Sequence, residues 1–207
     1  MTSTVSVAEL TKTIDKFSDM MPAGMKRSVR KHIKEYMLGI MLPPENRRKS
    51  VSNISSVLSE YDQSRINRAL HGIDSKLLEQ NYIKFLKTII VNHRVMFIGD
   101  DTILEHPSSR IMENVGWFFG HASGNNVLAH QPVTSGLYDL ETGIFYPFIT
   151  RLYVKRAQSE EEFKTKLKIM EDIFNTAENN FNVSGKAVDS WYSSFVLNSF
   201  SDCAILT

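Results

Sequence analysis

The stretch VMFIGDDT (residues 95–102) decides how the rest of the chain is interpreted. Its first four residues are apolar, and a glycine and two aspartates follow directly. A short apolar run that ends in this way is typical of a buried strand. In an open α/β sheet, ligands collect at the carboxyl ends of the strands. The stretch therefore predicts a strand that brings Asp100 and Asp101 to a functional site, although aspartates in such positions are also common turn and cap residues.

Two more strand candidates follow. Residues 127–136 (VLAHQPVTSG) and 144–154 (IFYPFITRLYV) are rich in β-branched and aromatic residues. Turn signals precede them at residues 124–126 (GNN) and 141–143 (ETG). Each candidate contains a proline, Pro132 or Pro147, which fits an edge or bulged position better than a regular central strand.

A helix and a fourth strand come next. Ser159 and the three glutamates after it predict the start of a long amphipathic helix, which ends near residues 179–180. Residues 187–188 form a short extended piece, and Asp189 follows directly. The predicted order is therefore strand, strand, strand, helix, strand, with acidic residues after the first and the last strand.

Carboxylates brought together at one sheet edge repel each other, and a divalent cation relieves that repulsion. Mg²⁺ prefers oxygen ligands and keeps several waters, so a carboxylate pair is a natural partial site for it. Two such ions about 3.5–4 Å apart can activate a water and stabilise a leaving oxygen in phosphodiester chemistry. The sequence contains no glycine-rich phosphate loop and no zinc-type Cys/His spacing, which leaves the carboxylates as the candidate chemistry.

The first part of the chain is predicted to be helical. Apolar residues recur at helical spacing in residues 7–17 and 33–41. Ser52 or Asn53 could cap a further helix after the Pro43-Pro44 pair, and two more helices are expected over residues 64–70 and 75–90. Cations gather near the junctions of these helices. They are Arg47, Arg48, Lys49, Arg65 and Arg68. The pattern indicates a helix-turn-helix arrangement that presents cations to DNA phosphates, but a small helical bundle with a charged surface would look the same.

The charge distribution supports a division into two regions. The whole chain carries a net charge of +1. Residues 1–94 hold 16 Lys and Arg against 9 Asp and Glu, and the remaining residues hold 8 against 14. A basic front and an acidic back indicate attraction to a polyanion and a carboxylate site, or simply two solvated faces of unequal charge.

Composition sets broad limits on the protein. With 207 residues, 42% of them hydrophobic, the chain is long enough for one large or two small globular domains. A single cysteine, Cys203, excludes a disulfide framework within the chain and favours a reducing compartment. No apolar run approaches the roughly 18 residues that a membrane span requires. We therefore expect a cytoplasmic, nucleoid-associated protein without a membrane partner.

Three stretches together resemble DDE-type transposases of bacterial and archaeal insertion sequences. FIGDDT (97–102), followed by ENVGWFFGHASGNNVLAHQPVTSGLYD (113–139), is similar to the region around the first catalytic aspartate of that family. AVDSWYSS (187–194) is similar to the region around the second. The basic stretch and the helices over residues 42–70 are similar to the helical N-terminal part of these proteins. The resemblance covers residues 41–194.

The resemblance implies an α/β protein in which a helical DNA-binding region (residues 1–93) precedes an incomplete RNase H-like mixed sheet with helices (residues 94–207). It implies that Asp100, with Asp101 as the less favoured choice, and Asp189 bind Mg²⁺ or Mn²⁺. In the complete ancestor a metal-activated water would cut one DNA strand, and the freed 3′-hydroxyl would attack target DNA. The partners would be double-stranded DNA, at transposon ends and targets.

In this family the third acid is a glutamate on a later helix. This chain has no glutamate beyond Glu178, and Asp202 follows Asp189 too soon to take that place. We therefore expect a truncated or frameshifted copy whose strand-transfer activity is doubtful. The alternatives are a non-catalytic DNA-binding module, which could form homodimers or mixed dimers with full-length transposase, and an inactive remnant.

Several other side chains have two interpretations. Trp117, Phe118 and Phe119 could stack on DNA bases but are more often core residues, whereas Trp191, beside Asp189, is a candidate DNA contact. His121 and His130 could hydrogen-bond near the metals but are more often structural. Three cations after the third strand candidate could contact phosphates or be solvated. They are Arg151, Lys155 and Arg156.

Overall fold

The computed structural model describes residues 7–19, 21, 24–41, 50–57, 63–107, 112–120, 123–161 and 163–192. The chain divides into two compact units between Leu86 and Lys87. The boundary expected from the sequence lies between residues 93 and 94. No helix in the described ranges is both long and apolar enough to cross a membrane.

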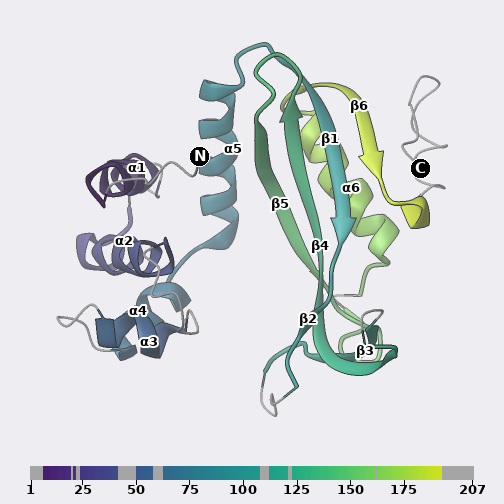
Figure 1. Cartoon of the computed structure of the whole chain (residues 1–207), viewed down its shortest axis with the longest axis horizontal. Helices are drawn as coiled ribbons and strands as arrows, with labels where there is room; N and C mark the ends of the chain where they lie inside the picture. Colours follow the sequence, from purple (N-terminus) through teal and green to yellow (C-terminus); the bar gives the residue numbers. More distant parts are fainter. Residues whose placement is uncertain are drawn as a thin grey trace. The chain divides into compact units, whose positions relative to one another are not determined.

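The first unit is helical (Figure 1). It holds α1 (Val7–Asp19), α2 (Arg27–Met41), α3 (Val51–Val57) and α4 (Gln63–His71), and α5 (Ser75–Ile89) continues into the second unit. The sequence had predicted a helix at each of these places, but α2 begins at Arg27 and not at residue 33. The core of the unit contains Met21, Ile33 and Ala69, and five partly buried hydrophobic residues pack against it: Phe17, Met25, Val29, Met37 and Ile73.

Side-chain caps begin two of these helices. The Ser50 hydroxyl accepts a hydrogen bond from the Asn53 amide at 3.3 Å, so Ser50 caps α3. The sequence had suggested Ser52 or Asn53 for this role, and that prediction was wrong. Asp74 caps α5, because its carboxylate accepts from the Leu77 amide at 3.0 Å. The Pro43-Pro44 pair lies outside the described residues.

The second unit contains a six-stranded mixed sheet (Figure 1). Its strands are β1 (Arg94–Asp101), β2 (Leu104–Glu105), β3 (Gly116–Gly120), β4 (Asn125–Asp139), β5 (Phe145–Tyr153) and β6 (Asn182–Val188). Four strands follow the order β2-β4-β1-β6, while β3 and β5 also pair with β4. The β1–β6 pair is parallel and all the others are antiparallel. The sheet and its helix α6 (Lys166–Glu178) confirm the expected α/β class and are consistent with an RNase H-like core.

The order of strands and helix was predicted correctly, but some bounds and two strands were not. Strand β1 does not end before the aspartates, because Asp100 and Asp101 still pair with Thr134 and Val133 of β4. Strands β2 and β3, which lie between the first two predicted strands, were missed. Both pair with the long strand β4, so tertiary pairing and not local composition defines them.

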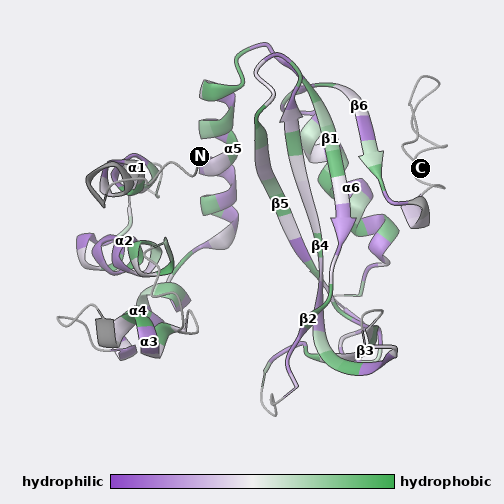
Figure 2. Cartoon of the chain, in the orientation of Figure 1, coloured by the Kyte–Doolittle hydropathy of each residue, from purple (hydrophilic) through white to green (hydrophobic). Residues whose placement is uncertain are grey.

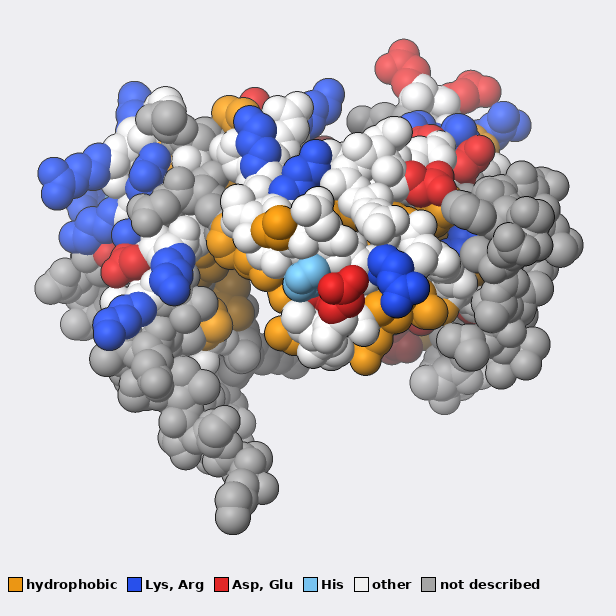
Figure 3. All heavy atoms as spheres, turned by 90° about the horizontal axis from the view of Figure 1, so that it is seen from above, with side chains coloured by type: hydrophobic (Ala, Val, Ile, Leu, Met, Phe, Trp, Pro, Cys, Tyr) orange, Lys and Arg blue, Asp and Glu red, His pale blue; other side chains and the backbone are white. Residues whose placement is uncertain are grey.

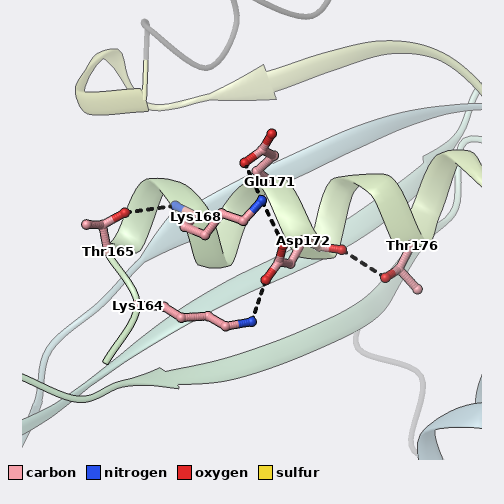
Figure 4. A network of polar contacts seen from close by, with 6 residues as sticks. All are labelled: Lys164, Thr165, Lys168, Glu171, Asp172 and Thr176. Carbon is pink, nitrogen blue, oxygen red and sulfur yellow. Dashed lines mark hydrogen bonds and ion pairs between the residues drawn. The ribbon is translucent and has the colours of Figure 1, made fainter. Parts of the chain in front are cut away.

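Helix α6 begins later than predicted. Its N-cap is Thr165, whose hydroxyl accepts from the Lys168 amide at 3.2 Å, and not Ser159 (Figure 4). The helix ends at the C-cap Asn179, as expected. The acidic residues at 160 and 161 therefore precede the helix and do not lie in its first turn.

The two strand prolines differ in their surroundings. Pro147 lies on β5, which pairs only with β4 within the described residues, next to an irregularity in the register, as predicted. Pro132 lies inside the central strand β4, so the edge prediction was wrong for it. The Pro132 carbonyl accepts from the Thr102 amide at 3.1 Å, and Thr102 lies where β1 has ended and β2 has not begun. An N–H at Pro132 would point to the same side, toward Thr102, so the proline forgoes one hydrogen bond at the point where β1 has ended.

One face of the sheet packs against α6. Val95 and Phe97 of β1 are fully buried, and the Phe97 ring meets Phe174 of α6 edge to face at 5.2 Å between centroids. Gly99 continues this face, because a Cβ built on it would lie 2.5 Å from the Met170 sulfur. In Figure 2, β1 is hydrophobic along most of its length and becomes hydrophilic at its carboxyl end. The core thus holds β1 in place and leaves its acidic end at the surface.

A buried carboxylate fixes the turn between β4 and β5. Asp139 is fully buried and accepts hydrogen bonds from the Glu141 and Thr142 amides at 2.9 and 3.2 Å and from His93 Nδ1 at 2.7 Å. Burial raises the pKa of Asp139, but these hydrogen bonds outweigh it and hold the pKa well below its usual range. The hydrogen bond to Asp139 raises the pKa of His93. Gly143, with φ of +70°, completes the predicted turn.

Candidate active site

The parallel pair β1–β6 brings the predicted aspartates to one edge of the sheet. Strands β1 and β6 lie side by side (Figure 1), and Gly99 pairs with Val188. Asp100 follows Gly99 within β1, and Asp189 follows Val188 directly after the end of β6. With Asp101, both border a cavity of about 890 Å³. The other residues that line this cavity are Thr102, Ile103, Glu105, Phe118, Phe119, Gly120, Gln131, Lys166 and Trp191. Two chain segments almost 90 residues apart therefore meet at one site.

The two neighbouring aspartates of β1 point to different faces, because side chains alternate along a strand. Asp101 follows Gly99 by two residues, so it lies on the face that packs against α6. Asp100 lies on the other face and is exposed, and its carboxylate accepts a hydrogen bond from the Asp101 amide at 2.7 Å. Only Asp101 therefore continues the buried face into the cavity.

Three side chains donate hydrogen bonds to the Asp101 carboxylate. They are Gln131 Nε2 at 2.6 Å, Tyr192 OH at 2.7 Å and Lys166 Nζ at 3.1 Å. The last contact is an ion pair in which the Lys166 and Asp101 side chains are only 20% and 16% exposed. Charge-assisted hydrogen bonds of this kind are stronger than neutral ones, so the carboxylate is held in a single position.

Each donor reaches Asp101 from a different element. Gln131 lies two residues before Val133, the β4 partner of Asp101, and so on the same face of the sheet. Lys166 is the first residue of α6, where the Thr165 cap fixes the backbone. Tyr192 closes the 3-10 turn Ser190–Tyr192, which the Tyr192 amide anchors to the Asp189 carbonyl at 2.8 Å.

The negative charge at this site changes the pKa of Tyr192. The Tyr192 side chain is fully buried. Burial raises the pKa of its phenol above the usual value, and the hydrogen bond to Asp101 and the negative charges of Asp101, Asp100 and Asp189 raise it further. All three carboxylates therefore lie close enough to one phenol oxygen to act on it.

The donor set suits a hard cation, but only in part. Mg²⁺ takes oxygen ligands, and one or two carboxylates with waters and substrate phosphates usually suffice. Within the described ranges, no three Asp, Glu, His or Cys side chains converge closely enough to form a metal cluster. The Lys166 ammonium also neutralises Asp101 in this arrangement. The residues present thus fit a partial site with two carboxylates.

The aromatic block on β3 alternates between the two faces of its strand. Phe118 is buried, whereas Trp117 and Phe119 are 63% and 52% exposed. The expectation of core packing was therefore correct only for Phe118. Trp191 is 66% exposed, lines the cavity, and has Lys166 Nζ 5.4 Å from its ring centroid.

The cations predicted to bind DNA are described only in part. Arg47, Arg48 and Lys49 lie outside the described residues. Arg65 and Arg68 are exposed on α4, and Arg68 Nε donates to the Ser64 carbonyl at 3.2 Å.

The other predicted contacts are mostly structural. His121 lies outside the described residues, and His130 Nε2 donates to the Glu113 carbonyl at 2.8 Å. Arg151 donates to the Thr150 carbonyl, and Lys155 donates to the Trp117 carbonyl. Arg156 lies 5.1 Å from the Phe163 ring centroid.

Sequence reasoning missed Gln131 and Lys166. The position of Lys166 in the first turn of a helix could have identified it. A cation there interacts unfavourably with the helix dipole, so a nearby anion is expected to stabilise it. Gln131 gave no such signal, since only the β1–β4 register places it beside Asp101.

Comparison with protein families gives one match. Residues 1–200 match the family described as "Archaeal putative transposase ISC1217". The match extends at both ends beyond residues 41–194, where the resemblance had been seen. No curated protein matches the chain.

Proposed function

The chain belongs to the ISC1217 family of DDE-type insertion-sequence transposases, and from this premise we propose that it cuts DNA at the cavity lined by Asp100, Asp101 and Asp189. The observation that carries the proposal is the parallel β1–β6 pair, which delivers carboxylates from two distant segments to one edge of the sheet. Phosphodiester transfer needs such a cluster of oxygen ligands.

Asp101 and Asp189 are the proposed metal ligands, with Mg²⁺ or Mn²⁺ as the cation. Sequence resemblance favoured Asp100, which also borders the cavity and is level with Asp189 in the β1–β6 register. We prefer Asp101 because Gln131, Tyr192 and Lys166 hold its carboxylate in one position at the cavity. A bound divalent cation would supply an activated water and stabilise the leaving oxygen. Lys166 would have to release Asp101 for the cation to bind, because both would compete for the same carboxylate.

The neighbouring side chains have distinct proposed tasks. Gln131 and Tyr192 hold Asp101 in position through hydrogen bonds of 2.6 and 2.7 Å. The Lys166 ammonium, once released, can pair with a phosphate of the substrate. Trp191 offers an exposed ring on which a base can stack. On the helical unit, Arg65 and Arg68, with Arg47, Arg48 and Lys49, are the proposed contacts to the DNA backbone.

The test is nicking of supercoiled plasmid in Mg²⁺ or Mn²⁺ by the full chain and by single Asn variants. We expect Asp101→Asn and Asp189→Asn to slow nicking about 100-fold or more, since each removes several kcal/mol of charge stabilisation. Asp100→Asn is the matched control and should stay within about tenfold of the unmodified chain. Loss in Asp100→Asn but not in Asp101→Asn would return the ligand role to Asp100. Equal nicking by all three variants would exclude this cavity.

A second candidate function is DNA binding without cleavage. The Lys166–Asp101 ion pair favours it. So does the absence, among the described residues, of three Asp, Glu, His or Cys side chains close enough together to hold a metal ion. DNA binding by the unmodified chain, with no metal-dependent nicking above that of Asp101→Asn, would support this alternative.

A further inference from the structure

Helix α2 carries a stripe of cations that the sequence analysis did not select. Arg27, Arg30, Lys31 and Lys34 are spaced three, one and three residues apart, which places them along one side of a helix. Together with Ser28 they border a surface hollow of about 530 Å³. We name these four cations the α2 stripe. They are contributed by a single helix, so their mutual arrangement is fixed by the helix geometry.

The α2 stripe lies away from the packed side of the helix. Val29, Ile33 and Met37, one turn apart, face the core of the helical unit. The stripe occupies the remaining surface, where Arg27 and Lys31 are exposed and the other two cations are half-buried. Figure 3 shows Lys and Arg side chains gathered over the helical part of the molecule with few acidic side chains among them.

Two acidic residues lie beside lysines of the stripe. Asp15 of α1 pairs with Lys34 at 2.7 Å, and Glu35 lies 4.0 Å from Lys31. Arg27 and Lys31, and likewise Arg30 and Lys34, are like charges one turn apart, which destabilise a helix. The first turn of α2 also holds no acidic residue, so Arg27 and Arg30 oppose the helix dipole. An external anion would relieve both kinds of repulsion.

We propose that the α2 stripe binds the phosphate backbone of duplex DNA. From Arg27 to Lys34 the helix axis advances about 10 Å. One strand of B-DNA presents a phosphate about every 3.4 Å of axis, so the stripe can meet about three of them. The inference rests on the proposed function, because it names the surface that holds the DNA. It places this surface on α2, in addition to the predicted cations of α4 and of residues 47–49.

The experiment measures binding of the full chain to a fluorescent random-sequence duplex by anisotropy, between 50 and 200 mM NaCl. The test variant is Arg27→Gln/Arg30→Gln/Lys31→Gln, which keeps the Lys34–Asp15 pair. Each lost phosphate contact should lower the slope of log K against log [NaCl] by about 0.9, or about 2.7 in total. Between 50 and 200 mM NaCl, the factor by which the affinity falls should therefore be about 40 times larger for the unmodified chain than for the variant. Its melting temperature should be unchanged or higher, because the like-charge repulsion is removed.

The matched control removes three exposed lysines of α5, as Lys76→Gln/Lys84→Gln/Lys87→Gln. It changes the net charge equally, and its slope should fall by less than about 1. Equal slopes in the two triple variants, or no duplex binding by the unmodified chain, would overturn the inference. Displacement of the duplex by poly-glutamate at the same charge concentration would also overturn it. Binding is measured without metal, so a failure of cleavage leaves this result intact.

Discussion

Replacing Lys166 by methionine removes the cation that pairs with Asp101 while keeping much of the side-chain volume. At 3.1 Å, an effective dielectric constant of about 20 gives a Coulomb energy of about 5 kcal/mol. Part of this loss is offset in the variant, because methionine has no charge that must be desolvated on folding and because Gln131 and Tyr192 still donate to the Asp101 carboxylate. We expect a net loss of about 2–3 kcal/mol in the free energy of unfolding, or about 10 °C in melting temperature.

The same change should strengthen metal binding. In the unmodified chain a cation must first break the ion pair, so Lys166→Met should lower the Kd for Mn²⁺ by about 30- to 160-fold. Mn²⁺ at about 100 times its Kd adds about 2.7 kcal/mol, which would restore the lost stability. Scanning calorimetry with and without MnCl₂, and Mn²⁺ titration followed by electron paramagnetic resonance, measure the two effects.

Lys164→Met is the matched control for this prediction. Lys164 forms an ion pair with Asp172 at 2.7 Å at the start of the same helix, but the two side chains are 56% and 37% exposed (Figure 4). Its loss should cost less than about 1 kcal/mol and leave Mn²⁺ binding unchanged. A metal-free Lys166→Met protein as stable as the unmodified chain would refute the energetic argument. Equal Mn²⁺ affinities would refute the competition between lysine and metal, and no Mn²⁺ binding by either protein would count against the metal site itself.

Two further predictions concern stability. The lowered pKa of Asp139 gives stability that is present above pH about 4 and lost as pH falls, and the raised pKa of His93 gives stability present below pH about 6.5 and lost as pH rises through its folded value. The stability difference between the unmodified chain and Asp139→Asn should therefore be largest between these limits in urea titrations, and a pH-independent difference would refute the linkage. Gly99→Ala places a methyl group against a fully buried methionine and should cost about 1–3 kcal/mol by thermal unfolding. Gly136→Ala meets the exposed ring of Phe145, which can turn away, and should cost less; an equal or larger cost for Gly136→Ala would show that the tight contact at Gly99 is not decisive.

The local chemistry of the sequence determined most of the elements. Local patterns of apolar and capping residues predicted the five helices of the first part, and the VMFI run placed β1 next to its aspartates. Turn residues placed the β4–β5 connection, where Gly143 adopts a positive φ. These features depend on neighbours within a few residues, which is why a single sequence is enough to predict them.

Only the tertiary structure decided which residues meet at the cavity. Strands β2 and β3 form because β4 is long enough to pair with them, and the β1–β4 register brings Gln131 to Asp101. The parallel β1–β6 register sets Asp189 beside Asp100, while the alternation of side chains along β1 turns Asp101 toward α6 and Lys166. Strand register and face depend on pairing between distant segments, and a shift of one residue would reverse them. The sequence therefore named the acidic residues of the site, and the folded sheet selected among them.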